Sequence, residues 1–498
     1  FVRIPSRITI LFDAMVFGWG SSGTTAASSE KESKEEVDGA VERAPFTFSS
    51  SSGGDEYVFP DLYDEADSML QVALLIYTVT DLRTLAKKKN TKLNTPERIL
   101  TLPIELGTCL EMIEENIDVI KEAFGDNDHE MTMSALKSIQ ERYEKNTLPG
   151  NNSSGSAGHH WWNPFSQEEN IEIQRLGSPV LVAYGDEKPM SDLVYAVGVD
   201  PLHKRITVAF RGSVTPADFL TDACISINLQ PNPVNKDAEE EGQSETIGIH
   251  HGFYDYLLKV KKDGKNKYEE ILEHVKSLFE ESEERQKSYK LYVTGHSLGG
   301  ALATLFSFHV AASALNGDNK EIPIPVTCVS VASPRVGEGS FQRAFRHLEE
   351  RGLLRHLRIA NDRDPVTIMP KSSGKKVWAN LSPISYMAFK MMDKEFVDKE
   401  TYRHTGIKLK LQPPDSKRKP QFELEYSGAA KSNAEQEKEG KESASITDVL
   451  GFHKIPNVVL HMGNAYTENL AVTKEHLKGQ GATLNGLYKT LALNTAKP

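Results

Sequence analysis

The ten residues 291–300 read Leu-Tyr-Val-Thr-Gly-His-Ser-Leu-Gly-Gly, and they decide the fold class. An apolar run leads into Gly295-His296-Ser297-Leu298-Gly299, and a long apolar stretch follows from Ala301 to Leu315. This order predicts a strand, a sharp turn and a helix. Such a turn presents its serine at a helix N-terminus, where N–H groups favour developing negative charge. We therefore predict that Ser297 is a nucleophile with its hydroxyl clear of the sheet edge. The alternative is an ordinary glycine-rich turn.

A nucleophilic serine needs an acid and a base, and chain order narrows the search. In hydrolases with this turn the acid follows the serine and the histidine follows the acid. The strand-like run Leu357 to Asn361 ends in Asp362 and Asp364, where a carboxylate can orient an imidazole. The position after a strand does not choose between the two aspartates, and a solvated turn acid is the alternative for each.

The candidate bases downstream are His404, His453 and His461. His461 follows the apolar, strand-like run 458–460 and precedes a predicted helix that contains Tyr466. A loop after the last strand suits a base that must reach Ser297. Taken alone, each histidine is more often an ordinary hydrogen-bonded residue, and the chain order shifts the interpretation toward His461.

Several further motifs resemble those of the class 3 lipases, the family of fungal triacylglycerol lipases, plant acyl hydrolases and diacylglycerol lipases. The resemblance covers about residues 175–470, and the motifs occur in the family's order. They are Val208 to Ser213, His250 to Phe253, Gly295 to Gly300, Ser333 to Gly337, Asn361 to Val366, Tyr402 to Gly406, and His461 with Tyr466.

The resemblance implies a role for each matching residue. Ser297 corresponds to the nucleophile, Asp364 to the acid and His461 to the base, with His453 as the alternative base. Ser213 is similar to the family's oxyanion serine, and the backbone N–H of Leu298 would be the second donor. His404 matches a structural histidine. No metal or organic cofactor is implied.

The same resemblance implies an α/β-hydrolase fold with a mostly parallel central sheet covered by helices on both faces. Strand-like runs that are apolar throughout agree with this, because parallel strands are covered on both faces. We expect strands at 180–184, 193–199, 206–210, 291–294, 326–331 and 357–359.

The implied activity is hydrolysis of acyl-lipid esters, either triacylglycerol or diacylglycerol or a polar glycerolipid, through a Ser-His-Asp triad and an acyl-enzyme. The alternatives are an esterase acting on non-lipid esters and an inactive lipase-like signalling scaffold. Two segments are candidates for handling lipid at a membrane or droplet interface: Phe219 to Ile225 and the methionine- and phenylalanine-rich run Ile384 to Phe396. Burial in the core is an equally good interpretation of both.

Composition shifts divide the chain into predicted regions. Residues 1–63 are a disordered or targeting segment, 64–147 a helical N-terminal region and 148–171 a linker. The lipase domain spans 172–475 with a polar insertion at 426–448, and 476–498 form a C-terminal tail.

Composition also limits the partners. A net charge of −12 argues against nucleic-acid binding. The three cysteines, Cys109, Cys224 and Cys328, are far apart in sequence and have neither the pattern of a disulfide framework nor metal-ligand spacing. Free thiols are expected, and a Cys224–Cys328 disulfide in an oxidising compartment is the alternative. The cluster at 159–162 is interpreted as packing rather than metal binding. No apolar run reaches the roughly 18–20 residues of a membrane span. Compartment and oligomeric state stay open, with an intracellular, plastid or lipid-associated location favoured over secretion.

Overall fold

The computed structural model describes residue 59 and residues 61–89, 180–186, 193–200, 204–213, 227–235, 244–261, 264–370, 402–413, 421–428 and 459–492. All of them lie within one compact unit, Phe48–Pro498. The predicted linker, both candidate lipid-handling segments, the 159–162 cluster, Cys109, Cys224 and His453 lie outside the described residues.

An eight-stranded sheet forms the centre of the described structure, in the order β1-β2-β3-β6-β7-β8-β9-β10. Neighbours from β3 to β9 are parallel, and the pairs β1–β2, β2–β3 and β9–β10 are antiparallel. This confirms a mostly parallel sheet. The strands are β1 (Val180–Gly185), β2 (Tyr195–Asp200), β3 (Arg205–Phe210), β6 (Lys290–His296), β7 (Val326–Val331), β8 (Leu354–Asn361), β9 (Ile407–Leu411) and β10 (Phe422–Tyr426).

Every predicted strand recurs in this sheet, with ends shifted by a few residues, but β9 and β10 were not predicted. Their polar residues alternate with apolar ones, so a search for fully apolar runs misses them. The hairpin of β4 (Ile227–Pro231) and β5 (Thr246–His250) was also missed. The strand-like interpretation of 458–460 was wrong where it can be checked, because Val459–His461 is a 3-10 helix, η4.

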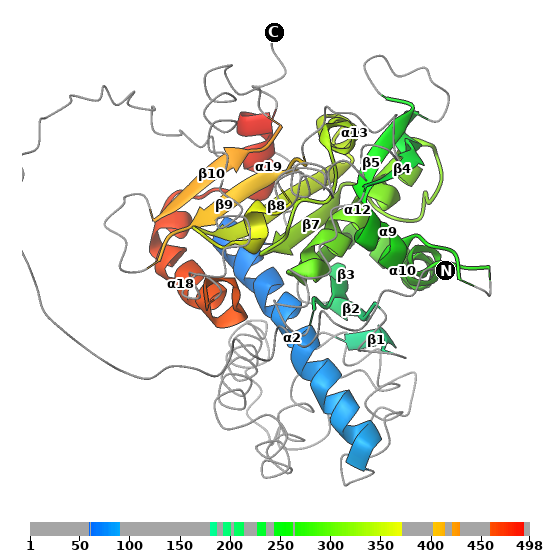
Figure 1. Cartoon of the computed structure of the whole chain (residues 1–498), viewed down its shortest axis with the longest axis horizontal. Coiled ribbons are helices and arrows are strands. Elements are labelled where there is room, and N and C mark those ends of the chain that lie inside the picture. The colour runs from blue at the N-terminus through cyan, green and yellow to red at the C-terminus, as the bar shows by residue number, and fades with distance from the viewer. Residues whose placement is uncertain are drawn as a thin grey trace, which may run out of the picture. The chain divides into compact units, whose positions relative to one another are not determined.

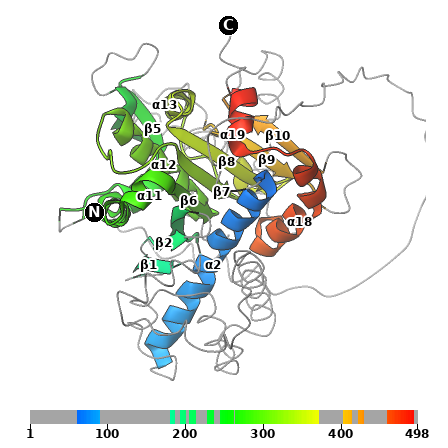
Figure 2. The same ribbon diagram turned by 180° about the vertical axis from the view of Figure 1, so that it is seen from behind.

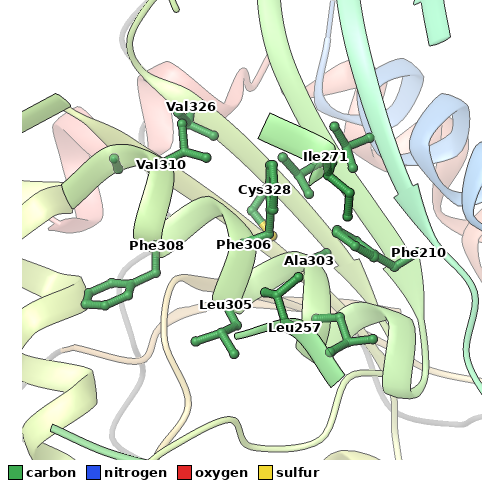
Figure 3. Packing of buried hydrophobic residues seen from close by; sticks show 14 of the residues in the cluster. Phe210, Leu257, Ile271, Ala303, Leu305, Phe306, Phe308, Val310, Val326 and Cys328 are labelled. Atoms are coloured by element: carbon green, nitrogen blue, oxygen red, sulfur yellow. The ribbon is translucent and has the colours of Figure 1, made fainter. Parts of the chain in front are cut away.

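One face of the sheet is covered by a layer of helices whose buried side chains are mostly apolar. Its helices are α9 (His251–Leu257), α10 (Lys267–Glu280), α12 (Leu298–Leu315) and α13 (Gly339–Glu350), with the short α11 (Glu283–Ser288) after α10. Figure 3 shows Phe210 of the sheet among Ile271, Ala303 and Phe306 of these helices. The free thiol of Cys328 is buried in the same cluster.

The opposite face is covered by α2 (Leu62–Lys89) and α18 (Gly463–Gly479), which lie side by side (Figures 1 and 2). The short α19 (Leu484–Leu487), followed by the π-helix η5 (Tyr488–Ala492), belongs to the same hydrophobic cluster. A helix near 64–90 was expected within an N-terminal region. In the structure it packs directly on β6, β3 and β7, and so contributes to the core beside the central sheet. The sheet is therefore covered on both faces, which confirms the predicted fold class.

Among the described residues, α12 is the helix long and apolar enough to match a membrane span, with a mean hydropathy of 1.5. However, 72% of that segment is buried inside the protein, where α12 packs against β6 and β7. Its apolar composition is explained by its place in the core.

Candidate active site

Ser297 lies at the turn between β6 and α12, at the carboxyl edge of the parallel strands. Its backbone has φ 57° and ψ −125°, in a region that L-residues rarely adopt. No side chain caps α12 at this position, so the first N–H groups of the helix face the turn. Ser297 is only 3% exposed, because His461 and the loop at Gly212 lie against it.

The glycines of the turn are required by close backbone approach. A Cβ atom placed on Gly299 would lie 2.1 Å from the carbonyl oxygen of Phe210, and one on Gly295 would lie 2.4 Å from the backbone of Gly299. Neither contact is possible for a real side chain. The strand β3 therefore presses so closely on the turn that only glycine fits on either side of Ser297.

The structure brings together Ser297, His461 and Asp364, which are far apart in sequence. His461 Nε2 lies 2.9 Å from Ser297 Oγ, and His461 Nδ1 lies 2.9 Å and 3.1 Å from the two carboxylate oxygens of Asp364. The histidine is 1% exposed and the aspartate 0% exposed. Serine, imidazole and carboxylate thus have the spacing that nucleophilic catalysis requires.

Asp364 is held by further donors. The backbone N–H of Val366 donates to one carboxylate oxygen at 2.9 Å, and the Tyr466 hydroxyl donates to the other at 2.6 Å. Burial, followed by the charge of Asp364, raises the pKa of Tyr466 well above its ordinary value, so the hydroxyl stays protonated and can donate. Asp362, the competing acid, instead has its carboxylate 3.3 Å from Lys410 Nζ.

His404 is placed away from Ser297 and supports the loop that carries the acid. Its Nε2 donates to the Thr367 carbonyl at 2.6 Å, and the Thr367 hydroxyl donates to the Asp364 carbonyl at 2.9 Å. Burial, helped by the charges of Arg358 and Arg335, lowers the pKa of His404 well below its ordinary value. A neutral, half-buried histidine that donates to a backbone carbonyl supports the loop, and this agrees with the structural role implied by its motif.

The segment at the end of β3 lies beside the nucleophile turn. A Cβ atom on Gly212 would lie 3.1 Å from Cβ of Ser297, and the half-buried Ser213 follows directly. Leu298, whose N–H was the second expected oxyanion donor, is the first residue of α12. Both predicted donors are therefore carried by segments that adjoin Ser297.

Two sets of residues at the site were not singled out from the sequence. The first holds the segment of His461: the Asn361 amide donates to the Leu460 carbonyl at 2.8 Å, and the Asn469 amide donates to Asn361 Oδ1 at 2.9 Å. Asn361 stands first in its motif, which was an available signal. The second set is Tyr77 and His296. Tyr77 is on α2, a helix in which no functional motif was found from the sequence.

Comparison with known proteins agrees with these features. The family described as "Lipase (class 3)" matches residues 207–373. The chain is 35% identical over 176 residues to the chloroplastic phospholipase A1-Igamma2 of Arabidopsis thaliana, which covers 34% of this chain and 31% of that protein. It is 34% identical over 185 residues to phospholipase A1-II 7 of Oryza sativa subsp. indica, covering 35% and 43%. The chloroplastic galactolipase DONGLE of Arabidopsis thaliana is 27% identical over 208 residues, covering 41% and 40%. The chain thus spans less than half the length of these relatives.

Solved structures that are similar include fungal lipases. The Rhizomucor miehei triacylglyceride lipase has 19% identity and a TM-score of 0.35, covering 54% of this chain and 78% of that one. The Yarrowia lipolytica LIP2 lipase has 19% identity and a TM-score of 0.35, covering 59% and 86%. The segment 207–373 of this chain, which contains the glycine-bounded turn at Ser297, matches the class 3 lipase family.

Proposed function

We propose that this protein hydrolyses carboxylic esters of acyl lipids, with Ser297 as nucleophile, His461 as general base and Asp364 as the acid that orients it. The observation that carries the proposal is the position of His461, whose two ring nitrogens lie 2.9 Å from Ser297 Oγ and 2.9 Å from an Asp364 oxygen. Asp364 accepts from Nδ1–H, which leaves Nε2 free to take the serine proton.

The reaction follows from this arrangement. Ser297 Oγ attacks the ester carbonyl while His461 takes its proton, and the Ser213 and Leu298 N–H groups stabilise the tetrahedral oxyanion. His461 then returns the proton to the leaving alcohol, and an acyl-enzyme remains on Ser297. Water, deprotonated by the same histidine, releases the fatty acid and restores the serine.

The proposed substrate is a polar glycerolipid, a phospholipid or a galactolipid. The aligned relatives are named phospholipase A1 and galactolipase. Exposed apolar side chains also flank the residues of the site: Val459 (59% exposed) and Met462 (43%) beside His461, and Ile368 (45%) after the acid loop. Apolar groups at this position favour an acyl chain over a soluble, polar ester.

The test compares the wild type with Ser297→Ala on phosphatidylcholine, monogalactosyldiacylglycerol and triacylglycerol in micelles, and on short-chain p-nitrophenyl esters. Ser307→Ala is the matched control, because Ser307 is also a buried serine, on α12, whose hydroxyl donates to the Ala303 carbonyl. We expect the wild type and Ser307→Ala to release fatty acid from a polar glycerolipid and Ser297→Ala to release none.

Each other outcome selects an alternative. Activity confined to soluble esters would indicate an esterase, and activity confined to triacylglycerol would replace the proposed substrate. An inactive wild type would favour the scaffold, and equal activity of wild type and Ser297→Ala would contradict the nucleophile.

A further inference from the structure

The hydroxyl of Tyr77, on α2, lies between two segments of the site. The backbone N–H of Gly212 donates to it at 3.0 Å, and it lies 3.2 Å from Nδ1 of His296, the residue before the nucleophile. The other ring nitrogen of His296, Nε2, lies 2.9 Å from the backbone carbonyl oxygen of His461. One chain of hydrogen bonds thus runs from the loop of Ser213, through α2 and the turn, to the backbone of the proposed base.

The direction of each proton in this chain is fixed by chemistry. A carbonyl oxygen only accepts, so His296 Nε2 must carry a proton and donate it to His461. Burial, followed by the charge of His461, lowers the pKa of His296 to about 3, so the ring is neutral and Nδ1 is an acceptor. Tyr77 must then donate its hydroxyl proton to Nδ1, and its oxygen is left to accept from Gly212.

The helix that carries Tyr77 is held in one register by buried polar contacts. The Tyr292 hydroxyl donates to Glu65 at 2.8 Å, Arg205 Nη2 donates to Ser68 Oγ at 3.0 Å, and the Tyr184 hydroxyl donates to the Ile76 carbonyl at 3.1 Å. A shift of α2 by one residue would break all three contacts. The position of the Tyr77 hydroxyl is therefore determined by the docking of the whole helix.

We propose that Tyr77 is a positioning residue for ester hydrolysis, through which α2 holds the oxyanion loop and the backbone of the base in register with Ser297. The inference rests on the proposed function of this site. Gly212 has its N–H engaged by Tyr77, and this orients the next N–H, that of Ser213, for the oxyanion. His296 in turn holds the backbone of His461, whose ring must reach both Ser297 and Asp364.

There is no room for a side chain at Gly212, where the loop after β3, helix α2 and the turn at Ser297 meet. A Cβ atom on Gly212 would lie 2.3 Å from the Tyr77 oxygen and 2.5 Å from the His296 carbonyl oxygen. The loop, the helix and the turn thus meet at van der Waals contact, and removal of the hydroxyl leaves a buried acceptor and an N–H without their partner. Small displacements of positioned groups cost rate rather than substrate affinity.

The test measures kcat and KM for p-nitrophenyl butyrate with Tyr77→Phe, which keeps the ring and removes the hydroxyl. We expect kcat to fall about 10- to 100-fold and KM to change less than about twofold. His296→Asn breaks the same chain from the other side, and the double variant should be no slower than the slower single variant. Tyr268→Phe is the control, because it removes a tyrosine hydroxyl in the layer on the other face of the sheet, where it lies 3.4 Å from Ser313 Oγ. It should keep the wild-type kcat.

The outcomes separate this inference from the proposed function. If the wild type is active, Ser297→Ala is inactive and Tyr77→Phe has the wild-type kcat, the positioning role is overturned and the hydrolase assignment stands. An equal fall of kcat in Tyr268→Phe and Tyr77→Phe, or additive effects in the double variant, would also overturn it. An inactive wild type would overturn both.

Discussion

The two layers that cover the sheet differ in how they are built. The layer of α9, α10, α12 and α13 buries phenylalanine, leucine, valine and alanine, with Phe306 and Phe308 of α12 fully buried. The layer of α2 and α18 also buries polar groups that pair across it, such as Glu65 with Tyr292 and Tyr466 with Asp364. Arg205 of β3 is 1% exposed beneath α2 and pairs with Asp200 at 2.8 Å.

This difference between the layers indicates that one layer mainly stabilises the fold and the other mainly fixes the geometry of the site. Apolar contacts are non-directional and tolerate exchanges that conserve volume. Buried hydrogen bonds fix one register, since a shifted arrangement leaves polar groups without partners. In our account the apolar layer supplies most of the folding free energy, and the polar layer places His461, Asp364 and Tyr77. The next three predictions test this division, from the largest expected effect to the smallest.

Asp364→Asn breaks the polar layer at its centre. The amide cannot hold the His461 tautomer in which Nδ1 donates, so we expect kcat to fall about 10⁴-fold. The melting temperature should change little while kcat falls greatly, because the replacement is isosteric. Steady-state kinetics beside a thermal melt would check this, and a kcat within tenfold of the wild type would rule out Asp364 as the acid.

Phe306→Ala tests the apolar layer instead. Phe306 is 0% exposed and packs 5.7 Å from Phe210, ring centroid to ring centroid (Figure 3). We expect a loss of about 3–5 kcal/mol in the free energy of unfolding, measured in urea. The kcat per folded molecule should stay within a few-fold of the wild type. A fall of kcat as large as that of Asp364→Asn would contradict the division between the layers.

Tyr466→Phe removes a single hydroxyl from the polar layer. That hydroxyl donates to Asp364 at 2.6 Å and accepts from the Asn361 N–H at 3.0 Å. Hydrogen bonds to charged groups contribute about 1.5–3 kcal/mol, so kcat should fall about 10- to 100-fold. Unchanged kinetics in this variant would show that Val366 N–H and His461 alone hold the carboxylate.

A further prediction concerns the pH dependence of stability and Glu349 of α13, which accepts from the Tyr488 and Tyr426 hydroxyls at 2.6 Å and 2.9 Å. Burial raises the pKa of Glu349 from its ordinary 4.5 to about 8. The folded state therefore holds a proton that the unfolded state releases above pH 4.5. The bound proton stabilises the folded state: this contribution to the free energy of unfolding is fully present below pH 4.5 and is lost as pH rises through about 8.

The measurement is the urea midpoint of the wild type and Glu349→Gln between pH 4.5 and 8.5. As pH rises, the urea midpoint of the wild type should fall relative to that of Glu349→Gln, because the carboxyl of Glu349 titrates and the amide does not. A difference that is constant across this range would mean that Glu349 ionises in the folded protein as it does in the unfolded chain.

Much of the fold followed from the sequence because local pattern and global architecture agree there. The turn at Ser297 is defined by its own glycines, and the parallel strands are apolar on both faces. The hairpin-like edge of β9 and β10 was missed because Lys408, Lys410, Glu423 and Glu425 alternate with the apolar residues. Edge strands and short helices such as η4 depend on partners that are distant in sequence.

The site shows the same limit. Ser297, Asp364 and His461 were ordered by chain position and motif, and the structure brings them within hydrogen-bond distance of one another. The position after β8 did not choose between Asp362 and Asp364; the resemblance favoured Asp364, and its 2.9 Å distance to His461 agrees with that choice. Tyr77 could not be found from the sequence. It is 219 residues from His296 along the chain, and only the packing of α2 on the sheet brings the two side chains together.

The central claim is that Ser297 is a nucleophile activated within this geometry, and active-site labelling tests it most directly. A fluorophosphonate ester transfers its phosphonyl group to an activated serine with loss of fluoride, and peptide mass spectrometry locates the adduct. Our account predicts one adduct per molecule, on Ser297, that forms much more slowly in Asp364→Asn. Labelling at another serine, or none at Ser297 in the folded wild type, would contradict it.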